Sequence, residues 1–133
     1  MDNLTGKWGG ADFHIILQED EKNDIHQDDW NILQIYPYKH SIHQCIGYDE
    51  GFLVLQFGYQ QIRVKPNHFQ VSDEPQFKPF ERVKYLNSKG VLEYGIVKGI
   101  HWHNNERRFY YDIEVNGKMK SRRYYDEDLE KSE

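Results

Sequence analysis

Four strand-like segments follow one another between Glu81 and Glu130 and decide the fold class. They read ERVKY (residues 81–85), EYGIVKGIHWH (93–103), RRFYYDIEV (107–115) and KMKSRRYY (118–125), and an acidic turn, DEDLE (126–130), closes the run. Alternating apolar and polar residues over such short segments are typical of strands with one buried face. The run therefore predicts a small all-β domain over residues 80–133.

The second segment carries two glycines, Gly95 and Gly99, which we expect to let the strand bend sharply. The two-residue period of a strand places four large residues on the face opposite to these glycines: Tyr94, Ile96, Ile100 and Trp102. Asn116-Gly117 is a pair favoured in two-residue hairpins of type I′. A continuous fourth strand is expected over residues 118–125, followed by one helical turn that brings Leu129 to the end of the core.

The N-terminal half shows a fainter strand pattern. Strands are expected over residues 14–18, 42–48, 52–57 and 60–65. Ahead of the second of these, Trp30, Leu33 and Tyr36 have helical spacing, but the letters ILQIY also suit a strand, and we favour a strand over residues 31–36. The polar stretch over residues 18–29 is predicted to be a solvated loop.

Two prolines and an acidic pair interrupt the strand pattern in SDEPQFKP (72–79), which we interpret as a linker. The predicted organisation is a β-rich domain over residues 1–71, the linker, and a second domain over residues 80–133. QQIRVKPNHFQ (60–70) parallels KSRRYYDEDLE (120–130), because each is a basic strand followed by a polar turn with one apolar residue. The parallel indicates an internal duplication.

Composition excludes some classes of protein and leaves others open. Aromatic residues make up 15% of the chain, which is too many for a disordered acidic protein. No apolar stretch approaches the ~18 residues of a membrane span, and the N-terminus lacks the basic start and apolar block of a signal peptide. With Cys45 as the single cysteine, the simplest expectation is a cytoplasmic protein that does not bind membranes.

The order of the C-terminal motifs, ERVKY, GIVKGIHWH, FYYDIEV, NG and SRRYYDEDLE, resembles the SH3-like barrel group that includes Tudor, chromo-barrel and KOW-type domains. The resemblance implies two small SH3-like barrels in tandem, or one barrel with a β-rich N-terminal extension. The whole chain also resembles a group of short bacterial proteins of unknown function, through its GYDEGFLVLQFGYQQIRVKP and YYDIEVNGKMKSRRYYDEDLE blocks. That second resemblance implies no activity.

The barrel resemblance implies a binding role and suggests an aromatic cage. Tudor-like domains hold methylated lysine or arginine between aromatic faces by cation–π attraction, with a carboxylate nearby. The matching positions in this sequence are Tyr85, Tyr94, Trp102 and Tyr110, with Asp112 as the carboxylate. The alternative interpretation is that these aromatic side chains belong to the core.

The basic strand offers a second binding hypothesis, contact with nucleic acid. Lys118, Lys120, Arg122 and Tyr124 would share one strand face, where cations bind phosphates and tyrosine stacks on bases. The net charge of −5 argues against this partner. Acidic neighbours would also neutralise the strand by cross-strand pairing.

Catalytic and metal signals are weak. His40-x-x-His43 and His101-x-His103 have spacings that occur often by chance, and no CxxC, HExxH, GxSxG or phosphate-binding motif is present. We expect no cofactor, no metal and no enzymatic activity, with a small hydrolase as a distant alternative. The predicted function is a binding module that recognises a protein or peptide through an aromatic and charged groove between the two halves, because ligand sites favour domain interfaces. Nucleic acid is the second choice.

Overall fold

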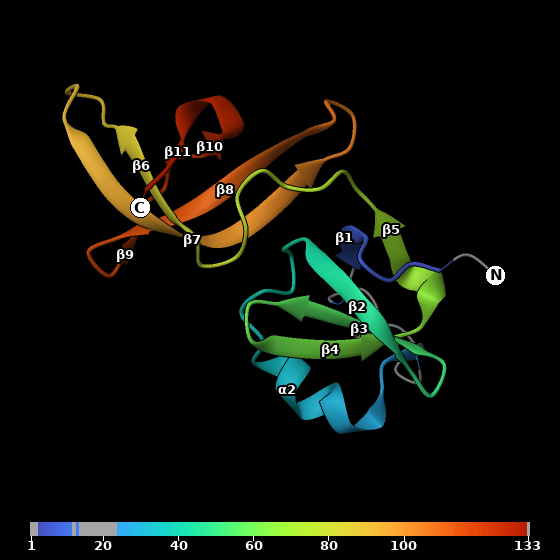
Figure 1. Ribbon diagram of the computed structural model, residues 1–133. Helices are drawn as coiled ribbons and strands as arrows, with labels where there is room; N and C mark the ends of the chain where they lie inside the picture. The colour runs from blue at the N-terminus through green and yellow to red at the C-terminus, as the bar shows by residue number, and fades with distance from the viewer. Residues whose placement is uncertain (1–2, 12, 14–23, 133) are drawn as a thin grey trace. The chain divides into compact units, whose positions relative to one another are not determined.

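A computed structural model describes residues 3–11, 13 and 24–132 of the chain. The described residues form two compact units, Met1–Glu74 and Pro75–Glu133, which we call the N-terminal and the C-terminal unit. Each unit contains one antiparallel sheet, so the predicted all-β class is confirmed (Figure 1). Nowhere in the described ranges does a helix have the length and apolar character needed to span a bilayer.

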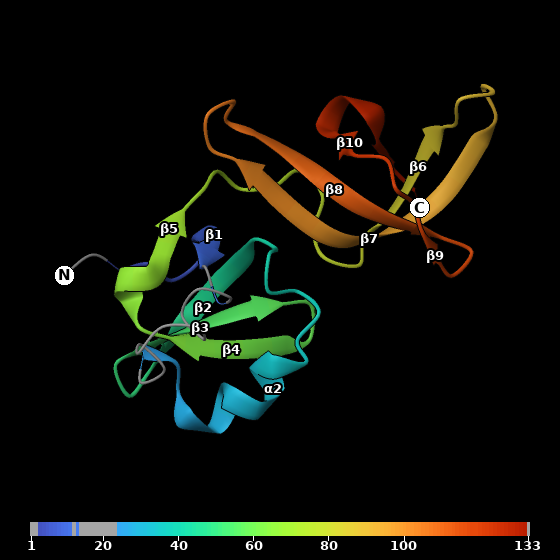
Figure 2. The same cartoon turned by 180° about the vertical axis from the view of Figure 1, so that it is seen from behind.

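The N-terminal unit contains a five-stranded sheet in the order β4-β3-β2-β1-β5. Its strands are β1 Trp8–Ala11, β2 His43–Asp49, β3 Phe52–Phe57, β4 Gln60–Val64 and β5 Phe69–Val71. A 3-10 turn, η3 (Pro66–His68), leads from β4 to β5, which pairs with β1. A second 3-10 turn, η2 (Gln27–Asp29), precedes a short helix, α2 (Trp30–Gln34), which lies beside β4 in both views of the molecule (Figures 1 and 2).

The C-terminal unit contains a sheet in the order β10-β8-β7-β6-β11, with β9 paired to β8. Its strands are β6 Arg82–Leu86, β7 Leu92–His103, β8 Arg108–Val115, β9 Lys118–Met119, β10 Tyr124–Tyr125 and β11 Glu130–Lys131. The 3-10 turn η4 (Asp126–Asp128) leads from β10 to β11, which pairs with β6. Asn116 and Gly117 both have positive φ angles, as the predicted type I′ turn requires.

The two sheets share one strand order and one register. In the first pair of strands, Gly9 faces His43 just as Val83 faces Gly95. The second strand of each sheet then contains a β-bulge, between Cys45 and Gly47 and between Val97 and Gly99. Residues can therefore be matched between the units through their strand partners alone.

The matching continues to the fifth strand. Leu53 pairs with Val64 in the N-terminal sheet, and Tyr111 pairs with Tyr124 at the matching place of the C-terminal sheet. Phe69 and Leu129 each follow the 3-10 turn and are 8% and 4% exposed. Phe69 faces Ala11, which places Ala11 at the position of Tyr85. The parallel between residues 60–70 and 120–130 thus has a structural counterpart.

The predicted strand over residues 31–36 is wrong, because α2 occupies this segment. The helical spacing of Leu33 and Tyr36 buries both side chains in the core, whereas Ile32 and Ile35 are exposed. The described part of the predicted solvated loop is solvated only at some positions. Gln27 and Asp28 are exposed, but Ile25 is 1% and Asp29 5% exposed. The strand predicted over residues 14–18 lies outside the described residues.

Two details of the C-terminal unit differ from the sequence expectation. The bulge at Lys98 shifts the alternation of β7, so Tyr94 and Ile96 lie on the opposite face from Ile100 and Trp102. The fourth strand is interrupted after Met119 and resumes only in β10. Phe77, from the predicted linker, is fully buried and packs edge-on against Tyr111 with ring centroids 5.4 Å apart.

Candidate functional site

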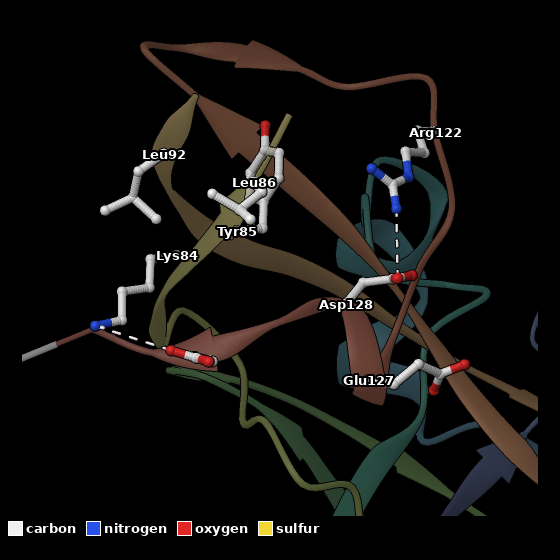
Figure 3. Close-up of a pocket in the computed structure, with 8 residues that line it drawn as sticks. Lys84, Tyr85, Leu86, Leu92, Arg122, Glu127 and Asp128 are labelled. Carbon is white, nitrogen blue, oxygen red and sulfur yellow. Dashed lines mark ion pairs between the residues drawn. The ribbon is translucent and has the colours of Figure 1, made fainter. Parts of the chain in front are cut away.

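A groove of about 480 Å³ opens in the C-terminal unit, between the start of the β6–β7 hairpin, the chain before β10, and η4. We call it the groove. Its lining residues are Lys84, Tyr85, Leu86, Leu92, Arg122, Glu127, Asp128 and Glu130. Figure 3 shows Tyr85 and Leu86 in the middle of the view, with Lys84 and Leu92 on one side and Arg122 and Asp128 on the other.

Tyr85 contributes a largely buried ring, which is 5% exposed. The ring packs against Tyr124 with centroids 4.7 Å apart, and the Tyr85 hydroxyl donates a 2.9 Å hydrogen bond to Oε1 of Glu93. Burial raises the pKa of Tyr85 above its usual value, and hydrogen bonds with Tyr124 and Glu93 raise it further. Tyr85 therefore stays neutral and offers a rigid aromatic surface with one polar end.

Leu86 and Leu92 form the apolar part of the groove. They face each other across the hairpin and are 62% and 45% exposed. The connecting loop holds them there, because Oδ1 of Asn87 accepts hydrogen bonds from the N–H groups of Lys89 and Val91. Adjacent exposed leucines beside a groove are typical of interaction surfaces.

Ion pairs flank the apolar residues on both sides (Figure 3). Nζ of Lys84 lies 3.9 Å from Oε2 of Glu130, and Nη2 of Arg122 lies 3.4 Å from Oδ1 of Asp128. The Arg122 guanidinium also lies 4.8 Å above the ring of Tyr124. These pairs are partly exposed, so they orient the side chains more than they stabilise the fold.

The structure separates the four aromatic residues proposed for a cage. Tyr94 lies on the face of β7 opposite to the core and is 59% exposed. Trp102 lies eight positions further along β7, roughly 25 Å away at the ~3.3 Å rise of a strand, where it packs against Phe109. Together with the burial of Tyr85, this spacing prevents one methylated side chain from contacting all of them.

Tyr110 and Asp112 lie together on the outer face of the C-terminal sheet, the face that carries Arg108, Tyr110, Asp112 and Glu114. His101 stacks on Tyr110 with centroids 4.8 Å apart, and its Nε2 lies 2.7 Å from Oδ2 of Asp112. This hydrogen bond lowers the pKa of Asp112, and the charge of Arg123 contributes. His101, Tyr110 and Asp112 do not line the groove.

The residues proposed as a basic surface also separate. Lys118 and Lys120 are exposed, but Tyr124 is 3% exposed and Arg122 is engaged by Asp128 and Tyr124. The interruption of the fourth strand is the reason, because it ends the regular alternation that would have aligned the four side chains.

Sequence reasoning identified Tyr85 and Arg122 but missed the other groove residues. Leu86 and Leu92 carried a usable signal, since one leucine stands on each side of the turn sequence NSKGV and register pairs them. Glu127 and Asp128 were interpreted only as neutralising charges, and Glu130 was assigned no role. Their place beside Tyr85 depends on η4 bringing β11 back to β6.

The histidine pairs do not form a metal site within the described residues, where no group of three or more suitable side chains comes together. His43 is fully buried in the N-terminal unit, with Nε2 2.7 Å from the Tyr36 hydroxyl and Nδ1 2.9 Å from the Ser41 carbonyl oxygen. His101 is held by Asp112.

Comparison with known proteins gives one family. A model described as "Family of unknown function (DUF6960)" matches residues 3–130, and this match carries no SH3-like or Tudor assignment. No curated protein and no solved structure matches the chain.

Proposed function

We propose that this chain, which belongs to DUF6960, a family of unknown function, is a non-enzymatic binding module that recognises a protein or peptide segment through the groove. Its two units would be small SH3-like barrels in tandem. The repeated strand order, with a 3-10 turn before the last strand, supports that architecture.

The observation that carries the proposal is the exposed pair Leu86 and Leu92 beside the groove. Burying a leucine side chain contributes about 1.5–3 kcal/mol, so covering both would provide substantial binding energy. The Lys84–Glu130 and Arg122–Asp128 ion pairs beside them offer polar groups of both signs. This combination of an apolar centre and a polar rim matches the anatomy of protein interfaces.

The acidic groups of the groove are held in place by neighbouring donors. Asp128 is engaged by Arg122 and by the backbone N–H of Tyr125, and Glu127 pairs with Arg108. Charge-assisted hydrogen bonds of this kind fix the positions of the carboxylates, which suits them to orienting a ligand. This supports a binding role.

A random-peptide display library selected on the purified full chain tests the proposal. Selected peptides should bind wild type in fluorescence anisotropy, and Leu86→Asp should weaken binding at least about tenfold, because it places a charge where an apolar group docks. Met119→Asp is the matched control, since Met119 is 53% exposed in the same unit and does not line the groove. Equal binding by wild type and Leu86→Asp would overturn the proposal.

Single-stranded nucleic acid is the second candidate, favoured by arginine–tyrosine stacks near the outer face. The guanidinium of Arg108 lies 3.7 Å from the ring centre of Tyr125, and that of Arg123 lies 4.5 Å from Tyr110. Both kinds of group bind single strands. Anisotropy with random DNA and RNA at low and moderate salt tests it, and absence of binding at low salt would exclude it.

A further inference from the structure

The N-terminal unit contains a counterpart of the groove position. Strand pairing matches Ala11 to Tyr85 and Val64 to Tyr124, and the 3-10 turns match His68 to Asp128. The same sheet position can therefore be compared in the two units, side chain by side chain.

In the N-terminal unit, the chain itself occupies this position. Residues 24–26 run along the edge of β4, where Lys65 N–H donates to the Asp24 carbonyl at 2.7 Å and His26 N–H donates to the Arg63 carbonyl at 3.0 Å. Ile25, which these bonds hold opposite Val64, is 1% exposed and joins the core cluster of Ala11 and Phe69.

Asp24, the residue before Ile25, makes a polar contact with the 3-10 turn η3. Oδ2 of Asp24 lies 2.7 Å from Nε2 of His68, the side chain at the position of Asp128. The occupant in the N-terminal unit thus has a simple chemistry. It is an extended segment with a buried aliphatic side chain, preceded by a charged side chain that pairs with the 3-10 turn.

The C-terminal unit has no equivalent segment between its first two strands. Residues 12–42 link β1 to β2, whereas Asn87–Val91 alone link β6 to β7. Tyr85 and Tyr124 are larger than Ala11 and Val64 and pack against each other at this position. The groove opens beside Tyr85.

We infer that the groove receives an extended peptide with an aliphatic side chain between Leu86 and Leu92, preceded by a basic residue that pairs with Asp128; this rests on the proposed function. The basic character of this peptide residue follows from the side chain of the 3-10 turn. His68 of the N-terminal unit pairs with the acidic Asp24, and Asp128, at the matching position, would pair with a basic residue. Acidic residues also outnumber basic ones around the groove, with Glu127, Asp128 and Glu130 against Lys84 and Arg122.

Recognition would use side chains and not strand addition. In the N-terminal unit the N–H of Lys65 bonds to the inserted segment, but the N–H of Tyr125, at the same position, already donates to Oδ2 of Asp128 at 3.0 Å. The peptide therefore finds no donor at this point of the edge. Its aliphatic side chain and the preceding cation make the contacts.

Three short synthetic peptides with fluorescent labels test the inference on the full chain: one with a lysine–isoleucine pair, one with aspartate–isoleucine and one with lysine–serine. The lysine–isoleucine peptide should bind about five- to tenfold more tightly than either of the others. Leu92→Ser should abolish the preference for isoleucine over serine, and Met119→Ser should preserve it. Asp128→Asn, which keeps an oxygen for the Tyr125 N–H, should reduce the preference for lysine over aspartate.

The outcomes separate this inference from the proposed function. Equal binding of the lysine–isoleucine and aspartate–isoleucine peptides, or library peptides that need Leu86 but lack a basic–aliphatic pair, would overturn the inference alone. Failure of every library and synthetic peptide to bind would overturn both. Folding of each variant is checked by the dispersion of its amide NMR spectrum.

Discussion

The sheets of the two units have the same strand order, but the two units fill the cores of these sheets differently. In the N-terminal unit, the small Ala11 shares one core cluster with Leu33 of α2 and with Ile25. In the C-terminal unit, Tyr85 and Tyr124 pack against each other from the strands themselves, and the first hairpin is short. One register can thus support either a self-covered sheet or a sheet with an open groove.

Equivalent positions also differ in polarity. His43 of the N-terminal unit is buried and bonded to Tyr36, while its counterpart Gly95 has no side chain and lies against Ile113. Arg63 binds the buried Asp29, while its counterpart Arg123 stacks on the partly exposed Tyr110. The N-terminal unit therefore depends more on buried polar contacts.

The largest contrast is expected from the two matched arginines. Arg63→Ala should lower the free energy of unfolding of the N-terminal unit by about 3 kcal/mol, because Asp29 would remain buried without its charged partner. In the structure, Nε and Nη2 of Arg63 lie 3.0 Å from the two Asp29 carboxylate oxygens. Urea unfolding followed by amide NMR resolves the loss unit by unit.

The matched variant Arg123→Ala loses a cation–π contact with Tyr110 and a charge interaction with Asp112. The expected loss is about 0.5–1 kcal/mol in the C-terminal unit. Similar losses for both arginines would show that residues 24–34 are not anchored as the structure indicates. This result would contradict the proposed difference between the N-terminal sheet, which its own chain covers, and the C-terminal sheet, which has an open groove.

A pH effect of similar size is expected in the N-terminal unit. Burial lowers the pKa of His43 from 6.5 to about 4, so the unfolded chain binds a proton in a range where the folded unit does not. The free energy of unfolding should therefore fall as pH drops from about 6.5 to about 4, by about 3 kcal/mol for this group. Urea titrations at several pH values measure the slope.

The control for this slope is His43→Gln, which removes the titrating ring. The variant is expected to be less stable at neutral pH, since the contact with Tyr36 changes, but this contribution to the slope should disappear. A slope unchanged by the substitution would mean that His43 is not the group responsible.

The smallest and sharpest contrast concerns the glycines after the two bulges. A methyl group on Gly99 would collide with the Asp112 carboxylate, so Gly99→Ala should cost about 1 kcal/mol by disturbing the His101 hydrogen bond. A methyl group on Gly47 meets nothing within 4 Å, and Gly47→Ala should be neutral or stabilise by about 0.5 kcal/mol. Thermal unfolding of both variants gives the signs, and equal signs would contradict the contrast.

The sequence predicted the regular strands well because their evidence is local. The alternation in residues 52–57 and 108–115, and the Asn116-Gly117 pair, are properties of neighbouring residues. The bulge at Lys98 was missed because one extra residue does not alter the kinds of residue found in a strand. It nevertheless reverses the sheet face on which each later side chain of β7 lies. The helix was missed because a short apolar segment suits both periods, and burial of Leu33 decides between them.

The residues of the candidate site also fall into those that the local sequence predicted and those that only the tertiary structure brought together. The sequence by itself determined the all-β class and the first three strand segments of the C-terminal half, since these follow from periodicity. It also selected Tyr85 and Arg122 as candidate site residues by their type. Only the tertiary structure decided which side chains meet, because strand register and the return of β11 to β6 bring together residues far apart in the chain. The same long-range pairing separated Tyr94 from Trp102 and opened the groove beside Leu86.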